Sequence, residues 1–128
     1  MAYAVSRTGV WDVDSDEATL PLLTINGIAN GQTIKLTCQF FARTMTDDLG
    51  DGFEYTIQVS GSVVPLTPGI GLVQGSDSWQ LYTHIALFEA QSPDEIQFKL
   101  TTEASDMNGK GAMMNFLMLA EIIDLKHS

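Results

Sequence analysis

The 128-residue sequence is short of basic residues, with six Lys and Arg against sixteen Asp and Glu and a formal net charge of −10. This balance argues against a nucleic-acid partner, because binding to phosphates depends on clusters of Lys and Arg that displace condensed counterions. The single cysteine, Cys38, excludes a disulfide within the chain. No basic segment followed by an apolar run opens the sequence, so no signal peptide is expected. No apolar run approaches the roughly 20 residues that a membrane helix needs.

Hydrophobic residues make up 45% of the chain, and in several segments they alternate with polar ones. From Ile34 to Ala42, every second residue is apolar, and the residues between them are mostly polar. This period of two is typical of a β-strand with one buried face, whereas a helix would scatter the charges around its circumference. The pattern predicts strands over residues 10–13, 20–25, 33–45, 53–64, 79–90, 95–103 and 112–125, and an irregular segment over 65–78.

These segments predict an all-β protein of about eight strands, folded as an antiparallel two-sheet β-sandwich with jelly-roll or other Greek-key connections. An immunoglobulin-like sandwich is the alternative, although the paired cysteines of such domains are missing. Residues 1–8 are expected to form an N-terminal arm and residues 9–128 a single domain. Short connectors at 46–52, 91–94 and Asn108-Gly109 predict hairpins that pair 33–45 with 53–64, and 79–90, 95–103 and 112–125 in succession.

Two of the predicted strands are apolar on both faces, which one sandwich does not require. In 112–125, Phe116 and Met118 lie on one face and Leu117 and Leu119 on the other. In 79–90, Trp79, Leu81, Ile85 and Leu87 are expected in the core. Monomeric proteins rarely leave a large contiguous apolar patch exposed to solvent. If the two strands flank the strand of Phe41, their reverse faces merge into one surface. We predict a homo-oligomer, with a trimer favoured, whose interface contains Phe41, Tyr82, His84, Phe88, Met113, Leu117, Leu119 and Ile123.

The surplus apolar surface has two alternatives to a subunit interface. Segments of the same chain, such as the N-terminal residues or 65–78, could cover it, or it could form a ligand groove. A carbohydrate- or receptor-binding module is the alternative function, with Trp11, Trp79, Tyr55, Tyr82 and Phe41 as rings for sugar stacking. Of these, Trp79 is expected in the core because it alternates in phase with Leu81 and Ile85.

Residues that could support catalysis or bind a cofactor are few. The acidic run 12–17 resembles the start of a calcium loop, but Glu17 and Leu23 stand where the EF-hand loop needs Gly and Glu. Asp47, Asp48 and Asp51 form a second acidic turn, and a cation site in either turn is an alternative to a solvated turn. The two histidines, His84 and His127, lack zinc-ligand spacing. No nucleophile motif or general acid–base pair stands out, so we predict no enzyme, no metal site and no cofactor.

A short, acidic, Cys-poor all-β chain with Asn-Gly dipeptides and the apolar final segment Asn115-Phe116-Leu117-Met118-Leu119-Ala120-Glu121-Ile122-Ile123 resembles small virion proteins of tailed bacteriophages. These include head decoration (cement) proteins and jelly-roll fibre tips, and the final strand is similar in character to that of C1q/TNF-like trimeric jelly rolls. The resemblance implies a structural, non-enzymatic role in a virion, with a capsid or other virion protein as partner and the N-terminal arm as the attachment. It implies no catalytic residues.

Overall fold

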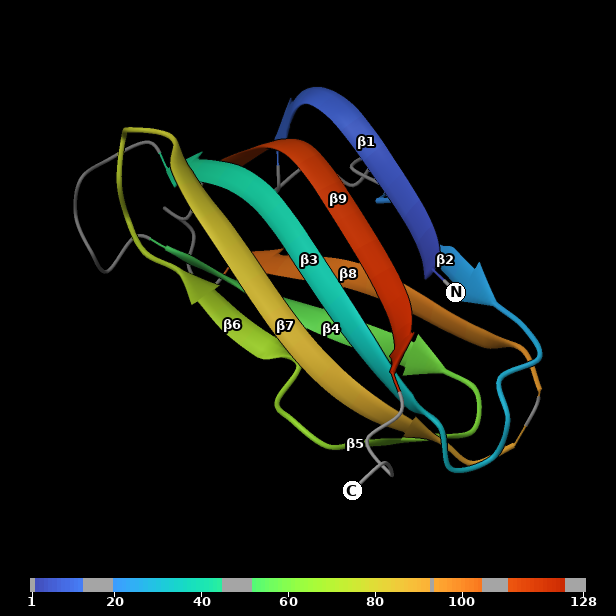
Figure 1. Cartoon of the computed structure of the whole chain (residues 1–128). Helices are drawn as coiled ribbons and strands as arrows, with labels where there is room; N and C mark the ends of the chain where they lie inside the picture. The colour runs from blue at the N-terminus through green and yellow to red at the C-terminus, as the bar shows by residue number, and fades with distance from the viewer. Residues whose placement is uncertain (1, 13–19, 45–51, 93, 105–110, 124–128) are drawn as a thin grey trace.

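The computed structural model describes residues 2–12, 20–44, 52–92, 94–104 and 111–123, and these residues form nine strands. Figure 1 shows them as two layers that face each other. None of the described residues belongs to a helix long and apolar enough to cross a membrane. The strands are β1 (Ala2–Asp12), β2 (Leu23–Ile25), β3 (Thr33–Thr44), β4 (Phe53–Ser60), β5 (Val63–Pro65), β6 (Ile70–Val73), β7 (Gln80–Ala90), β8 (Ile96–Ala104) and β9 (Gly111–Ile123).

The strands alternate between the two sheets along the whole chain. The odd-numbered strands form a five-stranded sheet in the order β1-β9-β3-β7-β5, and the even-numbered strands form a four-stranded sheet in the order β2-β8-β4-β6. All pairs are antiparallel. The all-β fold and its two antiparallel sheets are therefore confirmed (Figure 1).

The predicted hairpins are wrong. β3 pairs with β7 and β9, not with β4, and β4 pairs with β6 and β8. The strands β7, β8 and β9 likewise do not pair in succession, because β8 lies in the other sheet. A short polar connector turns the chain equally well within one sheet or across to the other, so composition alone does not distinguish the two. Asn108 and Gly109 lie outside the described residues.

Some predicted boundaries also differ. β1 begins at Ala2 and pairs with β9 from Glu121 to Ala112, so residues 2–8 form part of the sheet rather than a separate arm. The segment 65–78 contains β6, which pairs with β4 through Phe53, Tyr55 and their neighbours. In the range 20–25, only Leu23–Ile25 forms a strand.

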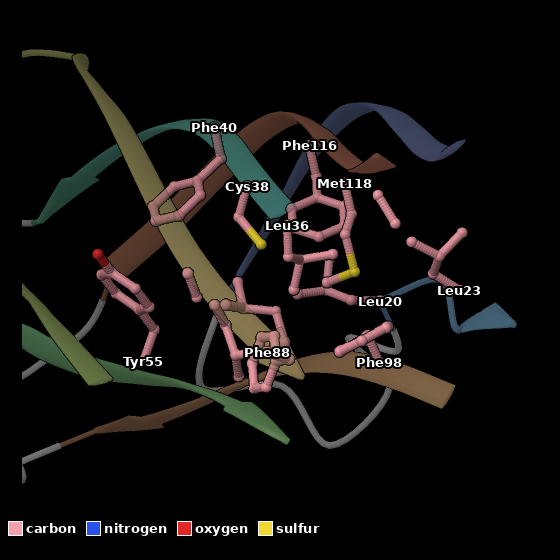
Figure 2. Close-up of a cluster of buried hydrophobic side chains, with 14 of the residues drawn as sticks. Leu20, Leu23, Leu36, Cys38, Phe40, Tyr55, Phe88, Phe98, Phe116 and Met118 are labelled. Carbon is pink, nitrogen blue, oxygen red and sulfur yellow. The ribbon is translucent and has the colours of Figure 1, made fainter. Parts of the chain in front are cut away.

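The core lies between the sheets, and β3 illustrates how the sequence builds it. Ile34, Leu36, Cys38 and Phe40 are fully buried, while the residues between them point to the outer face. Figure 2 shows Phe40, Cys38 and Leu36 extending from β3 toward Tyr55 and Phe98 of the opposite sheet. The Phe40 ring meets Tyr55 edge-on at 5.4 Å between centroids and stacks on Tyr82 at 5.7 Å. Side chains from both sheets therefore interlock, as in other β-sandwiches.

A bulge at Asn115 interrupts the alternation of β9. Asn115 has a φ of 54°, and one extra residue of β9 lies opposite β3 between the pairs Gln39–Leu117 and Phe41–Met114. Such a bulge reverses the faces of the residues on one side of it. Met113 is consequently buried, whereas Met114 faces outward beside Phe41.

Candidate functional site

The outer face of the five-stranded sheet is rich in apolar side chains. At one level of the sheet, Val10, Met114, Phe41 and Leu81 lie next to one another across four strands, in register. Val10 is 60% exposed and Leu81 is 52% exposed. We call this set the apolar row. A continuous apolar row of this kind is uncommon on the exposed surface of a monomeric protein.

The apolar surface continues along the sheet beyond this row. Leu117 follows one level away, between Ser6 and Gln39, and Leu119 and Ile85 follow at the next level, with Thr37 between them. Ile85 is 51% exposed. We use the name outer face for the outward side chains of the five-stranded sheet, of which the large apolar ones are Val10, Phe41, Val64, Leu81, Ile85, Leu87, Met114, Leu117, Leu119 and Ile123.

The corresponding side of the four-stranded sheet is more polar. Gln58 and Lys99 lie opposite each other on β4 and β8, and so do Ser60 and Gln97. Among the described strand residues of this surface, large exposed hydrophobics occur on the edge strand β6, at Ile70 and Leu72. The two sides of the sandwich therefore differ in the way expected if one faces water and the other is covered.

Charges on the outer face balance one another. The four charged side chains described there are Lys35, Arg43, Glu89 and Glu121, two of each sign. Lys35 and Glu121 are half-buried and lie in register on β3 and β9. The Arg43 guanidinium lies 5.2 Å from the centre of the Trp79 ring. The acidic surplus of the chain is therefore not carried by the described residues of this face.

Of the eight predicted interface residues, four lie on the outer face and four face the core. Phe41, Leu117, Leu119 and Ile123 belong to the outer face, on the strands β3 and β9. The strands β9 and β7 flank β3, which is the arrangement under which their outward side chains were expected to meet around Phe41. Whether this surface binds another subunit stays a prediction.

The other four residues face the core, so their assignment to an exposed face is wrong. Phe88 is 3% exposed, Met113 is fully buried, and Tyr82 packs against the core. For Met113 the cause is the bulge at Asn115. For Tyr82, His84 and Phe88 the cause is the orientation of β7, which is the reverse of the prediction.

β7 turns Tyr82 and His84 toward the core, where His84 has hydrogen-bond partners. The Tyr55 hydroxyl lies 2.9 Å from His84 Nδ1, and His84 Nε2 lies 2.9 Å from the Pro68 carbonyl oxygen. Because a carbonyl only accepts, the neutral imidazole of His84 carries its proton on Nε2, and in that form the Tyr55 hydroxyl donates to Nδ1. His84 thus links the two sheets and the segment before β6, while Leu81 and Ile85 are turned outward. These two residues and Met114 were missed, and no signal in the sequence separates two almost equally apolar faces.

Burial changes the acid–base behaviour of two groups beside His84. Burial raises the pKa of the Cys38 thiol from 9.0 to about 12. Burial also raises the pKa of Tyr55, and the negative charges that Cys38 and Tyr82 acquire on ionisation raise it further. Since the thiolate is the reactive form of cysteine, Cys38 is a packing residue.

Cys38 should therefore be inert to a thiol reagent in the folded protein. A pKa raised by about three units lowers the thiolate fraction near neutral pH about a thousandfold, and burial blocks access as well. Labelling with a chromogenic disulfide should be slow in buffer and fast in denaturant. Equal rates of Cys38 labelling in buffer and in denaturant would contradict the assignment of Cys38 as a packing residue.

The raised pKa of Cys38 also predicts that the free energy of unfolding falls as the pH rises from 9 toward 12, because the thiol ionises first in the unfolded chain.

The five aromatic residues considered for sugar stacking do not form one platform. Trp11 is 8% exposed and lies beneath Arg7, whose guanidinium is 4.5 Å from the ring centre. Tyr55 and Tyr82 pack in the core. Phe41 and Trp79 are half-buried toward the outer face, so the expected core position of Trp79 is wrong.

Residues 13–17 of the acidic run 12–17 lie outside the described residues, and so do the second acidic turn at 47–51 and His127. Within the part of the chain that the structure describes, no three His, Cys, Asp or Glu side chains gather as metal ligands would.

Comparison with known proteins places the chain in no family: no family model matches it, and no curated protein is similar to it. Among solved structures, it is similar to the tripod (BppUct-A-L) from the baseplate of bacteriophage Tuc2009. The TM-score is 0.49 and the sequence identity 12%, over 91% of this chain and 62% of that chain. The chain thus matches less than two-thirds of the baseplate chain, and a likeness this distant carries no information about function. The class that the structure defines is an antiparallel β-sandwich with one apolar outer face.

Proposed function

We propose that the protein is a non-enzymatic structural subunit that associates with further copies of itself through the outer face of the five-stranded sheet. The observation that carries this proposal is the apolar row, which runs across four adjacent strands with Val10 and Leu81 more than half exposed. A second copy is the occupant that we favour because the described charges on this face cancel. Two chains of charge −10 approach each other best where their acidic surplus is absent.

The size of the hydrophobic effect supports this association. Burying a large apolar side chain contributes about 1.5–3 kcal/mol. Leu81, Ile85, Leu117 and Val10 are each more than a third exposed, and the half-buried apolar residues of the face add to them. The loss of translational and rotational freedom opposes association by about 4–15 kcal/mol. Because these side chains are already about half-buried, each contributes about half of the full value. The apolar side chains of two copies together therefore reach the range of this cost.

The strand order supports jelly-roll connections, because successive strands alternate between the two sheets. A trimer and a place in a virion, as head decoration or as part of a fibre, rest on the resemblance of the sequence to small phage virion proteins. They remain proposals beside the assembly function.

The test compares two isoleucines with similar surroundings on opposite sides of the sandwich. Ile85 is 51% exposed opposite Thr37 on the outer face, and Ile70 is 58% exposed opposite Thr56 on the four-stranded sheet. Sedimentation equilibrium should show that the native chain is oligomeric at micromolar concentration. The substitution Ile85→Glu should raise the dissociation constant of the oligomer about 10–100-fold, as expected when a buried apolar contact of about 1.5–3 kcal/mol is lost.

Ile70→Glu serves as the matched control, because it adds the same charge to the protein at a similarly exposed site. It should leave the dissociation constant unchanged. A native chain that is monomeric at these concentrations would overturn the proposed function. Equal weakening by the two variants would indicate a general charge effect and remove the outer face from the contact.

A further inference from the structure

The four edges of the two sheets differ greatly in length. β5 and β2 have three residues each and β6 has four, whereas the edge strand β1 has eleven. Natural sheets protect their edges with short strands, prolines, charges or covering segments, because a free edge presents unpaired N–H and C=O groups to other chains. β5 follows this rule, since it is short and ends with Pro65. β1 contains no proline, and its partner strand among the described residues is β9 alone.

The outward side chains of residues 2–8 in β1 are small and uncharged. Ala2, Ala4, Ser6 and Thr8 face outward and are exposed, and none of them is charged. Arg7, on the other side of the strand, packs over the Trp11 ring. Residues 2–11 include no acidic residue. An approach of two copies along this edge would therefore bring no carboxylates of residues 2–11 together, although each chain carries a charge of −10.

The geometry of β1 sets the length of the strand that can be paired. Its register with β9 is continuous from Ala2 to Arg7 and shifts between Arg7 and Val10, where Gly9 has a φ of 93°. Because a bulge bends and twists a strand, the regular part of the edge is residues 2–7. Along this part, the N–H and C=O groups of alternate residues point away from β9.

We propose that β1 of one copy pairs antiparallel with β1 of a second copy about a two-fold axis through residues 2–7. The second copy follows from the proposed self-association, on which this inference rests. Such a pair joins two five-stranded sheets into one ten-stranded sheet, and it joins the two outer faces into one surface. A strand paired with its own copy matches it in length, and the register repeats on both sides of the axis.

A cysteine scan tests this pairing and its register. Ala2, Ala4, Ser6 and Thr8 are replaced by cysteine singly, and equimolar mixtures of Ala4→Cys with Ser6→Cys cover an axis through Val5. Oxidised glutathione accepts the two electrons and two protons that a new disulfide releases. A disulfide needs Cα atoms about 4.4–6.8 Å apart, and moving both cysteines two residues from the axis separates them by about 14 Å along the strands. The buried Cys38 does not compete.

We expect one position or one mixture to give at least tenfold more covalent dimer than its neighbours two residues away. Thr83→Cys is the matched control, because Thr83 is exposed on the same sheet but lies on the inner strand β7. If Thr83→Cys cross-links and no β1 cysteine does, the copies meet by their faces only; this result overturns the edge pairing and leaves the proposed function intact. A native chain that stays monomeric in sedimentation equilibrium overturns both.

Hydrogen exchange gives a second readout that face-to-face packing would not move. At protein concentrations above the dissociation constant, the outward-pointing amides of residues 2–7 should exchange at least tenfold more slowly than at concentrations below it. Amides of β6, an edge strand of the other sheet, are the internal reference. Exchange in β1 that does not change across this concentration range overturns the proposal, even where the mass shows an oligomer.

Discussion

Replacing Phe40 by alanine is expected to lower the free energy of unfolding by about 3–5 kcal/mol, the usual cost of removing a buried aromatic ring. Phe40 is fully buried between the sheets, where its ring meets Tyr55 edge-on and stacks on Tyr82. Because domains have a total stability of about 5–15 kcal/mol, this single change removes a large part of it. Urea unfolding followed by tryptophan fluorescence measures the loss.

Phe41 provides the control, since it is the next residue of β3 and faces the outer surface. Phe41→Ala should cost less than about 1.5 kcal/mol in the dissociated chain and should instead weaken association. Both variants are best compared in the Ile85→Glu background, so that loss of assembly does not add to the measured unfolding energy. Similar losses for Phe40→Ala and Phe41→Ala would show that β3 is covered equally on its two sides.

Replacing Asn115 by valine is expected to lower the free energy of unfolding by about 2–4 kcal/mol. Asn115 has a φ of 54°, a conformation that costs a β-branched residue about 1–3 kcal/mol. The change also removes the hydrogen bond that the Gly9 amide donates to Asn115 Oδ1 at 3.3 Å, which contributes about 0.5–1.5 kcal/mol. Asn115 is exposed, so no core contact is lost with its side chain.

Asn115→Gly separates the two causes, because glycine adopts a positive φ without strain but makes no side-chain hydrogen bond. It should cost less than about 1.5 kcal/mol. If the valine and glycine variants were equally unstable, the backbone conformation at the bulge would not be what limits this position, and the hydrogen bond to β1 would account for the effect.

The two pairs of variants also show how far the sequence alone predicts the structure. On β3, Ile34 to Ala42 are apolar at alternate positions, so the buried face follows directly from the pattern, as the structure confirms. On β9 the same reasoning succeeds from Phe116 to Ile122 and fails at Met113 and Met114, where the bulge reverses the faces. An asparagine in an apolar strand is compatible with a bulge, but it does not say that one is present.

The outer face was likewise predicted from the sequence only in part. The sequence showed that β7 and β9 carry more apolar side chains than a two-layered fold requires. It predicted that their outward side chains meet around Phe41 only on the condition that the two strands flank β3. The sequence did not show that Leu81 and Ile85 face outward, because Tyr82, Ala86 and Phe88 offer an almost equally apolar face. That choice depends on the inward contacts of β7: Tyr82 stacks on Phe40 of the neighbouring strand, and His84 contacts Tyr55 of the opposite sheet and the Pro68 carbonyl.

The amino-acid sequence by itself determined the all-β class and the alternating strands, because a period of two depends on neighbouring residues only. It also determined the surplus of apolar surface, since this is a matter of composition. The tertiary structure alone decided that successive strands cross between the sheets and that β7 turns its leucines outward. It alone placed the eleven-residue strand β1 at an edge of the five-stranded sheet. Each of these depends on contacts between residues far apart in the chain, and such contacts leave no local pattern from which they could be read.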